Sequence, residues 1–289
     1  MIIDYTNKLD INNSHVEIHK NRNREKYTFA NINLLGKCNA NCYFCLGKDI
    51  EDVLLPHNQL ETLFPSWKNF EYFLNRCREE NIKKLYLTGQ TADGLQYNYL
   101  NELIHFLQDN GFLVGVRTNG YLAKEKIKSI NNMKEEIGYS IQSLIPERNK
   151  IIMGRSDIPD WEYIIPKSGD NVRVSIVFTR YNMDEILDII KYCSKFRNVK
   201  YIQLRRISTD TRVSLLQPDI DLFEAFVLGM KERYKEIGNF YGAEIYEIFG
   251  KPVSIWRTVE TSCNSLNYFT DGTCSDEYFI IEGYMKDKS

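Results

Sequence analysis

Residues 29–45 read FANINLLGKCNANCYFC, a short apolar run followed at once by three cysteines. The first seven residues have the length and apolar character of a buried strand. Gly36 ends this run, and polar residues then separate Cys38, Cys42 and Cys45. The sequence therefore predicts a strand that leads directly into a cysteine-rich loop.

The spacing of these cysteines, C-x3-C-x2-C, suits an iron–sulfur cluster. Three thiolates leave one iron of a four-iron cluster without a protein ligand, and catalysis needs such an open position. A structural zinc site is one alternative, but it needs a fourth Cys or His nearby, and the next such residue is the distant His57. Buried free cysteines are a second alternative, which the polar Asn39 and Asn41 argue against.

The bulk composition is that of an ordinary globular protein. The chain has 289 residues, of which 43% are hydrophobic and 26% charged, enough for one large domain with a normal core. The net charge of −2 argues against nucleic acid as a partner. No apolar run suits a membrane span, and the first residues lack the apolar segment of a secretory signal, so we expect a cytoplasmic protein without membrane contact. In that reducing compartment, seven cysteines favour metal or catalytic use over disulfides.

Apolar strand-like runs alternate with amphipathic segments along the rest of the chain. We expect strands at Phe29–Leu35, Lys84–Thr88, Val114–Thr118, Ile137–Ile141, Val172–Thr179 and Tyr201–Arg206. Helices are expected at Lys68–Glu80, Tyr97–Asp109, Lys124–Asn132, Asp184–Cys193 and Asp219–Ile237. The segment between the fourth and fifth strands, which includes Asp157–Ile165, gives no clear pattern. This alternation predicts an α/β fold with a parallel sheet, open or partly closed into a barrel, and a site at the carboxyl ends of the strands.

Three regions are expected along the chain. Residues 1–26 form a loosely ordered N-terminal arm, residues 27–242 form the barrel, and residues 243–289 form a short C-terminal cap with two strands around a polar loop. Cys77 and Cys193 fall on apolar faces of predicted helices, which indicates core packing rather than chemistry.

The cysteine motif, with Phe44 directly before the last cysteine, is similar to the signature of the radical S-adenosylmethionine (SAM) superfamily. The resemblance implies a partial (β/α)6 TIM-type barrel, with a [4Fe–4S] cluster on Cys38, Cys42 and Cys45. It also implies that SAM chelates the open iron and is reductively cleaved to a 5′-deoxyadenosyl radical, which takes hydrogen from a substrate. The cofactor carries this chemistry, and the protein supplies placement and exclusion of water.

The resemblance extends to the loops after later strands. Gly89 and Gln90 stand where relatives have Gly-Gly-Glu-Pro, a loop that binds the cofactor's ammonium group, although Gln90 replaces the usual carboxylate. Thr118 and Asn119 are similar to the Thr-Asn-Gly turn of molybdenum-cofactor-cyclase-like members, and a plain turn is the alternative.

After the fourth strand, Ser140-Ile141-Gln142-Ser143 looks like the Ser-Leu-Asp-Ser of the same relatives. The resemblance implies that Ser140 meets the cofactor carboxylate and that Gln142 lies near its ribose. Gln142 again replaces an acid. Phe44, Gly89, Gln90, Thr118, Asn119, Ser140 and Gln142 are thus the expected cofactor-binding residues.

Candidate catalytic residues are Arg205, Asp210, Cys263 and Cys274. Alternation places Arg205 and Arg206 on opposite faces of the last strand, so at most one points into the barrel, where it could grip an anion or a peptide backbone. A surface ion-pair cluster is the alternative. Cys263 or Cys274 could donate a hydrogen atom to a substrate radical or bind an auxiliary cluster, but two cysteines alone do not make a convincing second cluster site.

The sequence and the resemblance together indicate a radical SAM enzyme that acts on a small polar metabolite or a peptide. An electron donor such as flavodoxin or ferredoxin is implied as a partner. The alternative is a non-catalytic iron–sulfur electron carrier or sensor, which would need four protein ligands and no cofactor pocket.

Overall fold

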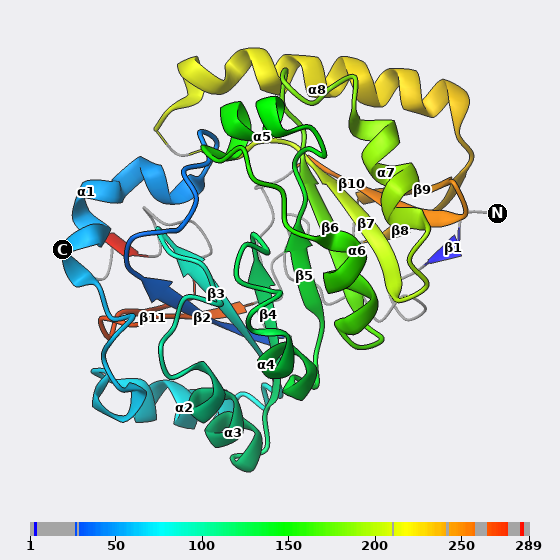
Figure 1. The fold of residues 1–289 in the computed structure, drawn as a ribbon. Helices are drawn as coiled ribbons and strands as arrows, with labels where there is room; N and C mark the ends of the chain where they lie inside the picture. Colours follow the sequence, from blue (N-terminus) through cyan, green and yellow to red (C-terminus); the bar gives the residue numbers. More distant parts are fainter. Residues whose placement is uncertain are drawn as a thin grey trace.

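The computed structural model describes residues 3–4, 27, 29–209, 211–240, 243–257, 265–276 and 284–285. One curved sheet of twelve strands runs through this part of the chain (Figure 1). Its centre is formed by six parallel strands in sequence order, namely β2 (Phe29–Leu35), β3 (Lys84–Gln90), β4 (Leu113–Thr118), β5 (Ile137–Ser140), β6 (Val172–Val177) and β7 (Val199–Arg205). The predicted α/β class and partial barrel are confirmed.

Helices connect these strands and lie on the outside of the sheet (Figure 1). They are α1 (Glu51–Leu54), α2 (Phe70–Glu79), α3 (Leu100–Asp109), α4 (Ile127–Asn132), α5 (Pro146–Met153), α6 (Trp161–Ile164), α7 (Ile186–Ser194) and α8 (Val213–Arg233). Short 3₁₀ helices occupy Leu46–Ile50, Leu55–His57, Phe64–Ser66 and Ile165–Lys167. Helices α5 and α6 fall in the stretch after the fourth strand that the sequence leaves unclear.

Three of these helices share one burial pattern. The buried residues of α2, α3 and α7 recur at i, i+3, i+4 and i+7, which places one apolar stripe against the sheet. Cys77 and Cys193 belong to these stripes and are fully buried, as the sequence predicts. Helix α8 begins at Val213, earlier than the predicted start at Asp219, because the fully buried Leu216 anchors the turn before Pro218.

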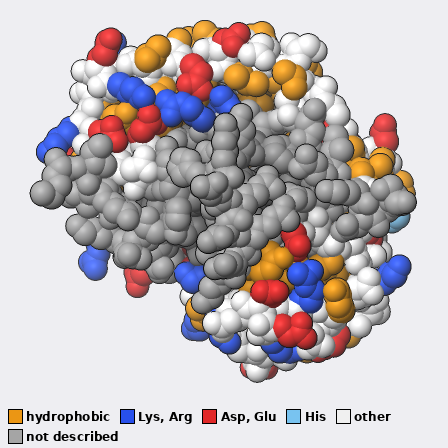
Figure 2. Space-filling view, turned by 180° about the vertical axis from the view of Figure 1, so that it is seen from behind, with side chains coloured by type: hydrophobic (Ala, Val, Ile, Leu, Met, Phe, Trp, Pro, Cys, Tyr) orange, Lys and Arg blue, Asp and Glu red, His pale blue; other side chains and the backbone are white. Residues whose placement is uncertain are grey.

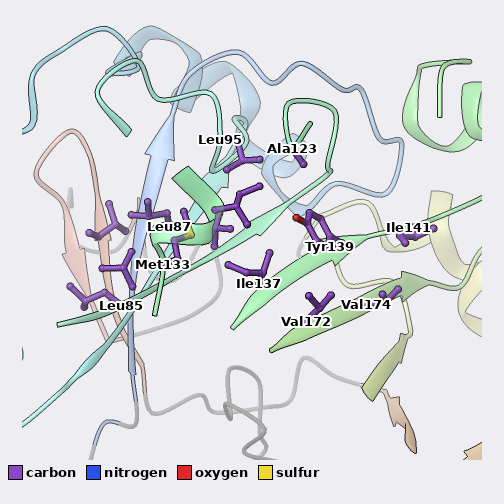
Figure 3. Packing of buried hydrophobic residues seen from close by; sticks show 14 of the residues in the cluster. Leu85, Leu87, Leu95, Ala123, Met133, Ile137, Tyr139, Ile141, Val172 and Val174 are labelled. Carbon is purple, nitrogen blue, oxygen red and sulfur yellow. The ribbon is translucent and has the colours of Figure 1, made fainter. Parts of the chain in front are cut away.

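The two faces of the central strands differ in chemistry. Leu85, Leu87, Ile137, Tyr139, Val172 and Val174 pack in the apolar layer with Leu95, Ala123 and Met133 (Figure 3). Because side chains alternate along a strand, the residues between them point to the opposite, inner face. Those inner residues include Thr88, Gly138, Ser140, Arg173 and Ser175. The lumen of this barrel is therefore polar, whereas its outer layer is apolar.

The described strands of the C-terminal region pair with both edges of the central sheet. Strand β10 (Lys251–Trp256) pairs in parallel with β7, and β11 (Ser265–Phe269) pairs in parallel with β2. Strand β9 (Ala243–Ile248) forms a hairpin with β8 (Glu236–Phe240), so the expected boundary at residue 242 falls inside that hairpin. The described part of residues 243–289 thus extends the same sheet at both edges.

The ends of the sheet are short strands. Strand β1 (Ile3–Asp4) pairs with β8, and β12 (Cys274–Ser275) pairs with β11. The remainder of the expected arm, residues 1–2 and 5–26, lies outside the described residues. None of the described helices has the length and apolar character that crossing a membrane requires.

The surface seen in Figure 2 carries mixed charge. Lys and Arg side chains lie among Asp and Glu side chains over the described part of this face. Such a pattern is typical of a solvated surface rather than of a continuous basic one.

Candidate functional site

One cavity of about 250 Å³ opens at the carboxyl ends of the parallel strands. It is lined by Cys38, Cys42 and Cys45 and by all of the expected cofactor-binding residues, namely Phe44, Gly89, Gln90, Thr118, Asn119, Ser140 and Gln142. These residues come from the ends of four strands and the loops that follow them, so four parts of the chain meet at one place. Their contacts with a cofactor stay predictions.

The cysteine loop is held through its backbone by distant parts of the chain. Arg212, just before α8, donates to the carbonyl oxygens of Tyr43 (2.7 Å) and Cys45 (2.6 Å). Arg155 donates to the carbonyl oxygen of Asn39 (2.9 Å). A loop of this length cannot build a core of its own, so these charge-assisted bonds set its shape.

The three cysteines are partly buried. Burial raises the pKa of Cys38 to about 12, and the nearby Asp93 carboxylate adds to this effect. Burial also raises the pKa of Cys42, with further contributions from Cys45 and Cys38, and it raises the pKa of Cys45. Without a metal the thiols are therefore neutral at pH 7, and binding of iron must displace their protons.

Asp93 is a site residue that the sequence analysis missed. It is buried and accepts hydrogen bonds from Thr118 Oγ1 (2.8 Å) and from the backbone nitrogens of Asn119 (2.7 Å) and Leu95 (3.0 Å). Burial raises the pKa of this carboxyl group, and the three hydrogen bonds oppose that shift. Asp93 thus fastens the turn after β4 to the loop after β3.

The loop after β3 leaves no room for a side chain on Gly89. A Cβ atom there would lie 2.0 Å from the carbonyl oxygen of Ala92. Thr91 adopts a φ of 62°, in the left-handed region. The close approach of the Ala92 backbone therefore requires glycine at position 89.

Several expected cofactor contacts already have protein partners. Thr118 donates to Asp93, and Gln142 Oε1 accepts from the backbone nitrogen of Val177 (2.7 Å). Asn119 Nδ2 donates to Asn39 Oδ1 (2.7 Å), which joins the turn after β4 to the cysteine loop. These residues shape the cavity through their protein contacts.

The catalytic candidates are not all brought together. Arg205 lines the cavity, as does Arg206, although the Arg206 guanidinium pairs with Glu224 of α8 at 3.2 Å. Cys274 does not line it, because β12 places this thiol in a separate pocket with His57 and Asp271. Asp210 and Cys263 lie outside the described residues.

The polar lumen below the cysteines contains further residues that the sequence analysis did not select. Arg173 pairs with Glu136 (2.8 Å) and donates to Gln203 Oε1 (2.7 Å), and all three are buried. Asn31 donates to Asn267 Oδ1 (2.8 Å) and accepts from Arg117 Nη1 (3.4 Å). The available signal was the alternation of polar residues with apolar ones within β2, β6 and β7.

The donor set fits an iron–sulfur cluster with one open iron. The described residues that line the cavity provide three thiols, no fourth cysteine and no histidine. No three His, Cys, Asp or Glu side chains in the described part of the chain converge on a single ion, as zinc would require. Asn39 Nδ2 is buried in this loop without a hydrogen-bond partner, so a polar donor is left for a bound group.

Comparisons with known proteins agree with this donor set. A family model described as "Radical SAM superfamily" matches residues 32–195, more than half of the chain. GTP 3′,8-cyclase of Clostridium perfringens (strain 13 / Type A) is 28% identical over 197 residues, which is 65% of this chain and 58% of the cyclase. An S-adenosylmethionine-dependent nucleotide dehydratase of Thermoplasmatales archaeon (strain ISO4-H5) is 26% identical over 163 residues, 54% of either chain. The chain thus spans less than two thirds of these relatives.

Solved structures share the fold. Streptococcus suis SuiB bound to S-adenosylmethionine has a TM-score of 0.59 and 12% identity, covering 89% of this chain and 61% of SuiB. Native anSMEcpe with bound AdoMet and a Cp18Cys peptide has a TM-score of 0.50 and 13% identity, covering 88% and 74%. At such identities the likeness concerns the fold alone.

Proposed function

The chain belongs to the radical SAM superfamily, and on that premise we propose that it is a radical SAM enzyme acting on a small polar metabolite or a peptide side chain. Members of this superfamily use a [4Fe–4S] cluster and SAM. When bound, these cofactors supply reductive cleavage of SAM and a radical that takes a hydrogen atom from the substrate. The residues of this chain would bind and orient these cofactors and the substrate.

One observation carries the proposal. The three cysteines line the same cavity as every residue expected to hold SAM, and this cavity continues into the polar lumen. An electron carrier would need neither an open iron nor a lined cavity beside it. The arrangement therefore supports catalysis over electron transfer alone.

The protein's own role is to bind and orient. We propose that Cys38, Cys42 and Cys45 hold the cluster. Phe44, Gly89, Gln90, Ser140 and Gln142 would line the SAM pocket, with Thr118 and Asn119 positioned there by Asp93. Gln90 would offer a neutral carbonyl where relatives offer a carboxylate, so it would hold an ammonium group less strongly.

The substrate would enter the lumen between SAM and the strands. The relatives named above include enzymes of nucleotides, and SuiB has also been solved with a precursor peptide. Both kinds of molecule carry polar groups that the hydroxyl, amide and guanidinium side chains of the lumen could bind. A reducing partner such as flavodoxin or ferredoxin would supply the electron.

The test is anaerobic reconstitution with iron and sulfide, followed by dithionite and SAM, with 5′-deoxyadenosine measured by mass spectrometry. We expect the product from the native chain and none from Cys42→Ala, because the cluster loses a ligand. Cys193→Ala is the matched control: it removes a buried thiol of α7 that does not line the cavity, and it should retain product formation.

The opposite result would favour the electron carrier. If a cluster forms, but SAM neither binds in a titration nor yields 5′-deoxyadenosine, the proposed function is wrong. Equal product from native and Cys42→Ala protein would also contradict it.

A further inference from the structure

The side chains that line the cavity carry an excess of positive charge. Four arginines line it, namely Arg117, Arg173, Arg205 and Arg206, whereas Asp93 is the one carboxylate among the described lining residues. Asp93 also stands at the cysteine end, bound to Thr118 and to Asn119. The charge of the lumen away from the cysteines is therefore basic.

Two of these arginines have carboxylate partners. Arg173 is buried against Glu136 at 2.8 Å and also donates to Gln203. Arg206 pairs with Glu224 at 3.2 Å. Because their guanidinium groups already have carboxylate partners, these two arginines contribute to the electrostatic potential and the shape of the cavity rather than bind a ligand directly.

Arg205 differs from both. It is the last residue of β7, lies opposite Val177 and Trp256, and is only partly exposed. Its side chain makes no ion pair or hydrogen bond with the described residues. A guanidinium that is partly removed from water without a partner costs free energy, which a bound anion would offset.

Two serines line the same cavity as Arg205. Ser140 and Ser175 face each other on β5 and β6, Ser175 in turn pairs with Gln203 on β7, and both hydroxyls line the cavity. A guanidinium fork beside hydroxyl donors is the arrangement that binds carboxylate or phosphate oxygens.

We propose that the lumen binds an anionic group of the substrate, a carboxylate or a phosphate, through Arg205. This inference rests on the proposed function, since it assigns the substrate class of the same cavity. It adds a requirement for negative charge and a residue that recognises it.

The test is isothermal titration calorimetry of the reconstituted, SAM-loaded protein with two probes, inorganic phosphate and succinate. We expect at least one probe to bind, and whichever binds identifies the group. Binding should weaken about tenfold in Arg205→Gln, because a charge-assisted pair is lost. Arg205→Lys should lose part of the affinity, since it keeps the charge but not the planar fork.

Arg148→Gln is the matched control, because it makes the same charge change at a residue that pairs with Asp184 and does not line the cavity, and binding should persist. Arg206→Gln should weaken binding less than Arg205→Gln does. If neither probe binds, or if Arg205→Gln binds as well as native protein, the inference is wrong. If Arg206→Gln loses as much affinity for the anion as Arg205→Gln does, the anion is attracted by the overall positive charge and not bound by Arg205. That result would also overturn the inference.

Formation of 5′-deoxyadenosine is measured separately in the native chain. Product without anion binding would defeat this inference alone, and anion binding without product would defeat the proposed function alone.

Discussion

Arg212 links the cysteine loop to the rest of the barrel. Besides its bonds to two loop carbonyls, it donates to the fully buried Asp49 at 2.5 Å. Removing one partner of a buried pair leaves an uncompensated charge. We expect Arg212→Gln to lower the free energy of unfolding by about 3 kcal/mol and to reduce the iron retained after reconstitution. Urea unfolding and iron analysis measure both effects.

Lys124→Gln is the control for Arg212. Lys124 pairs with Asp160 at 2.8 Å, but both side chains are exposed, so no measurable loss is expected. If the two variants unfold at the same urea concentration and retain equal iron, the role given to Arg212 is wrong.

At the residue scale, the sequence is informative where the chemistry is local. The three cysteines lie within eight positions, so their spacing alone indicates a shared ligand. Asp93 could not be selected in this way, because its partners Thr118 and Asn119 belong to another loop and meet it only in the fold. The same limit applies to Cys274, whose distance from the cavity depends on where β12 pairs.

At the scale of the strands, Gly138 is constrained by its neighbours across the sheet. It pairs with Arg117 on β4 and with Arg173 on β6, and a Cβ atom would lie 2.6 Å from Arg173 Nη2. Arg173 cannot move freely, because Glu136 and Gln203 hold it. We expect Gly138→Ala to lower the free energy of unfolding by about 2 kcal/mol, measured by urea unfolding.

Gly229→Ala provides the comparison. Gly229 lies inside α8, where an added Cβ would meet nothing within 4 Å. The alanine should stabilise the helix by up to about 1 kcal/mol. Destabilisation by both variants, or by neither, would contradict the close packing described for Gly138.

The elements themselves could be predicted because their signals are periodic. The stripe Leu100, Leu103, Ile104 and Leu107 marks α3 without any knowledge of the fold. The start of α8 could not be predicted, because burial of Leu216 overrides the local tendency of Pro218 to end a helix.

The C-terminal residues are part of the barrel at the scale of the whole molecule. Tyr268 of β11 is fully buried, stacks on Phe73 of α2 at 4.9 Å between ring centroids, and donates to the carbonyl oxygen of Lys68 (2.8 Å). We expect Tyr268→Ala to lower the free energy of unfolding by about 4 kcal/mol, because it leaves a large cavity.

Tyr72→Ala is the control, since Tyr72 lies on the same α2 and is 58% exposed. It should unfold close to the native chain. Unfolding of both variants in urea is followed by circular dichroism. If Tyr268→Ala loses no stability, β11 is dispensable to the barrel.

The sequence predicts the class of the fold but not the way the barrel is extended. Local patterns identify short strands after residue 242, yet they cannot tell which edge each strand joins. That choice depends on pairings such as Asn31 with Asn267, which are far apart along the chain. The sequence therefore predicts a C-terminal cap of short strands without predicting which barrel strands they pair with.

The division of each barrel strand into an apolar outer set and a polar inner set has an evolutionary consequence. Outer residues such as Val172 and Val174 pack in the apolar layer that attaches the helices to the sheet, whereas inner residues such as Arg173 and Ser175 line the lumen. Substitutions confined to the inner set can change what the lumen accepts while the helices stay in place. A descendant of this chain could therefore acquire a new substrate through a few inward-facing changes, provided that tightly packed inner positions such as Gly138 are kept.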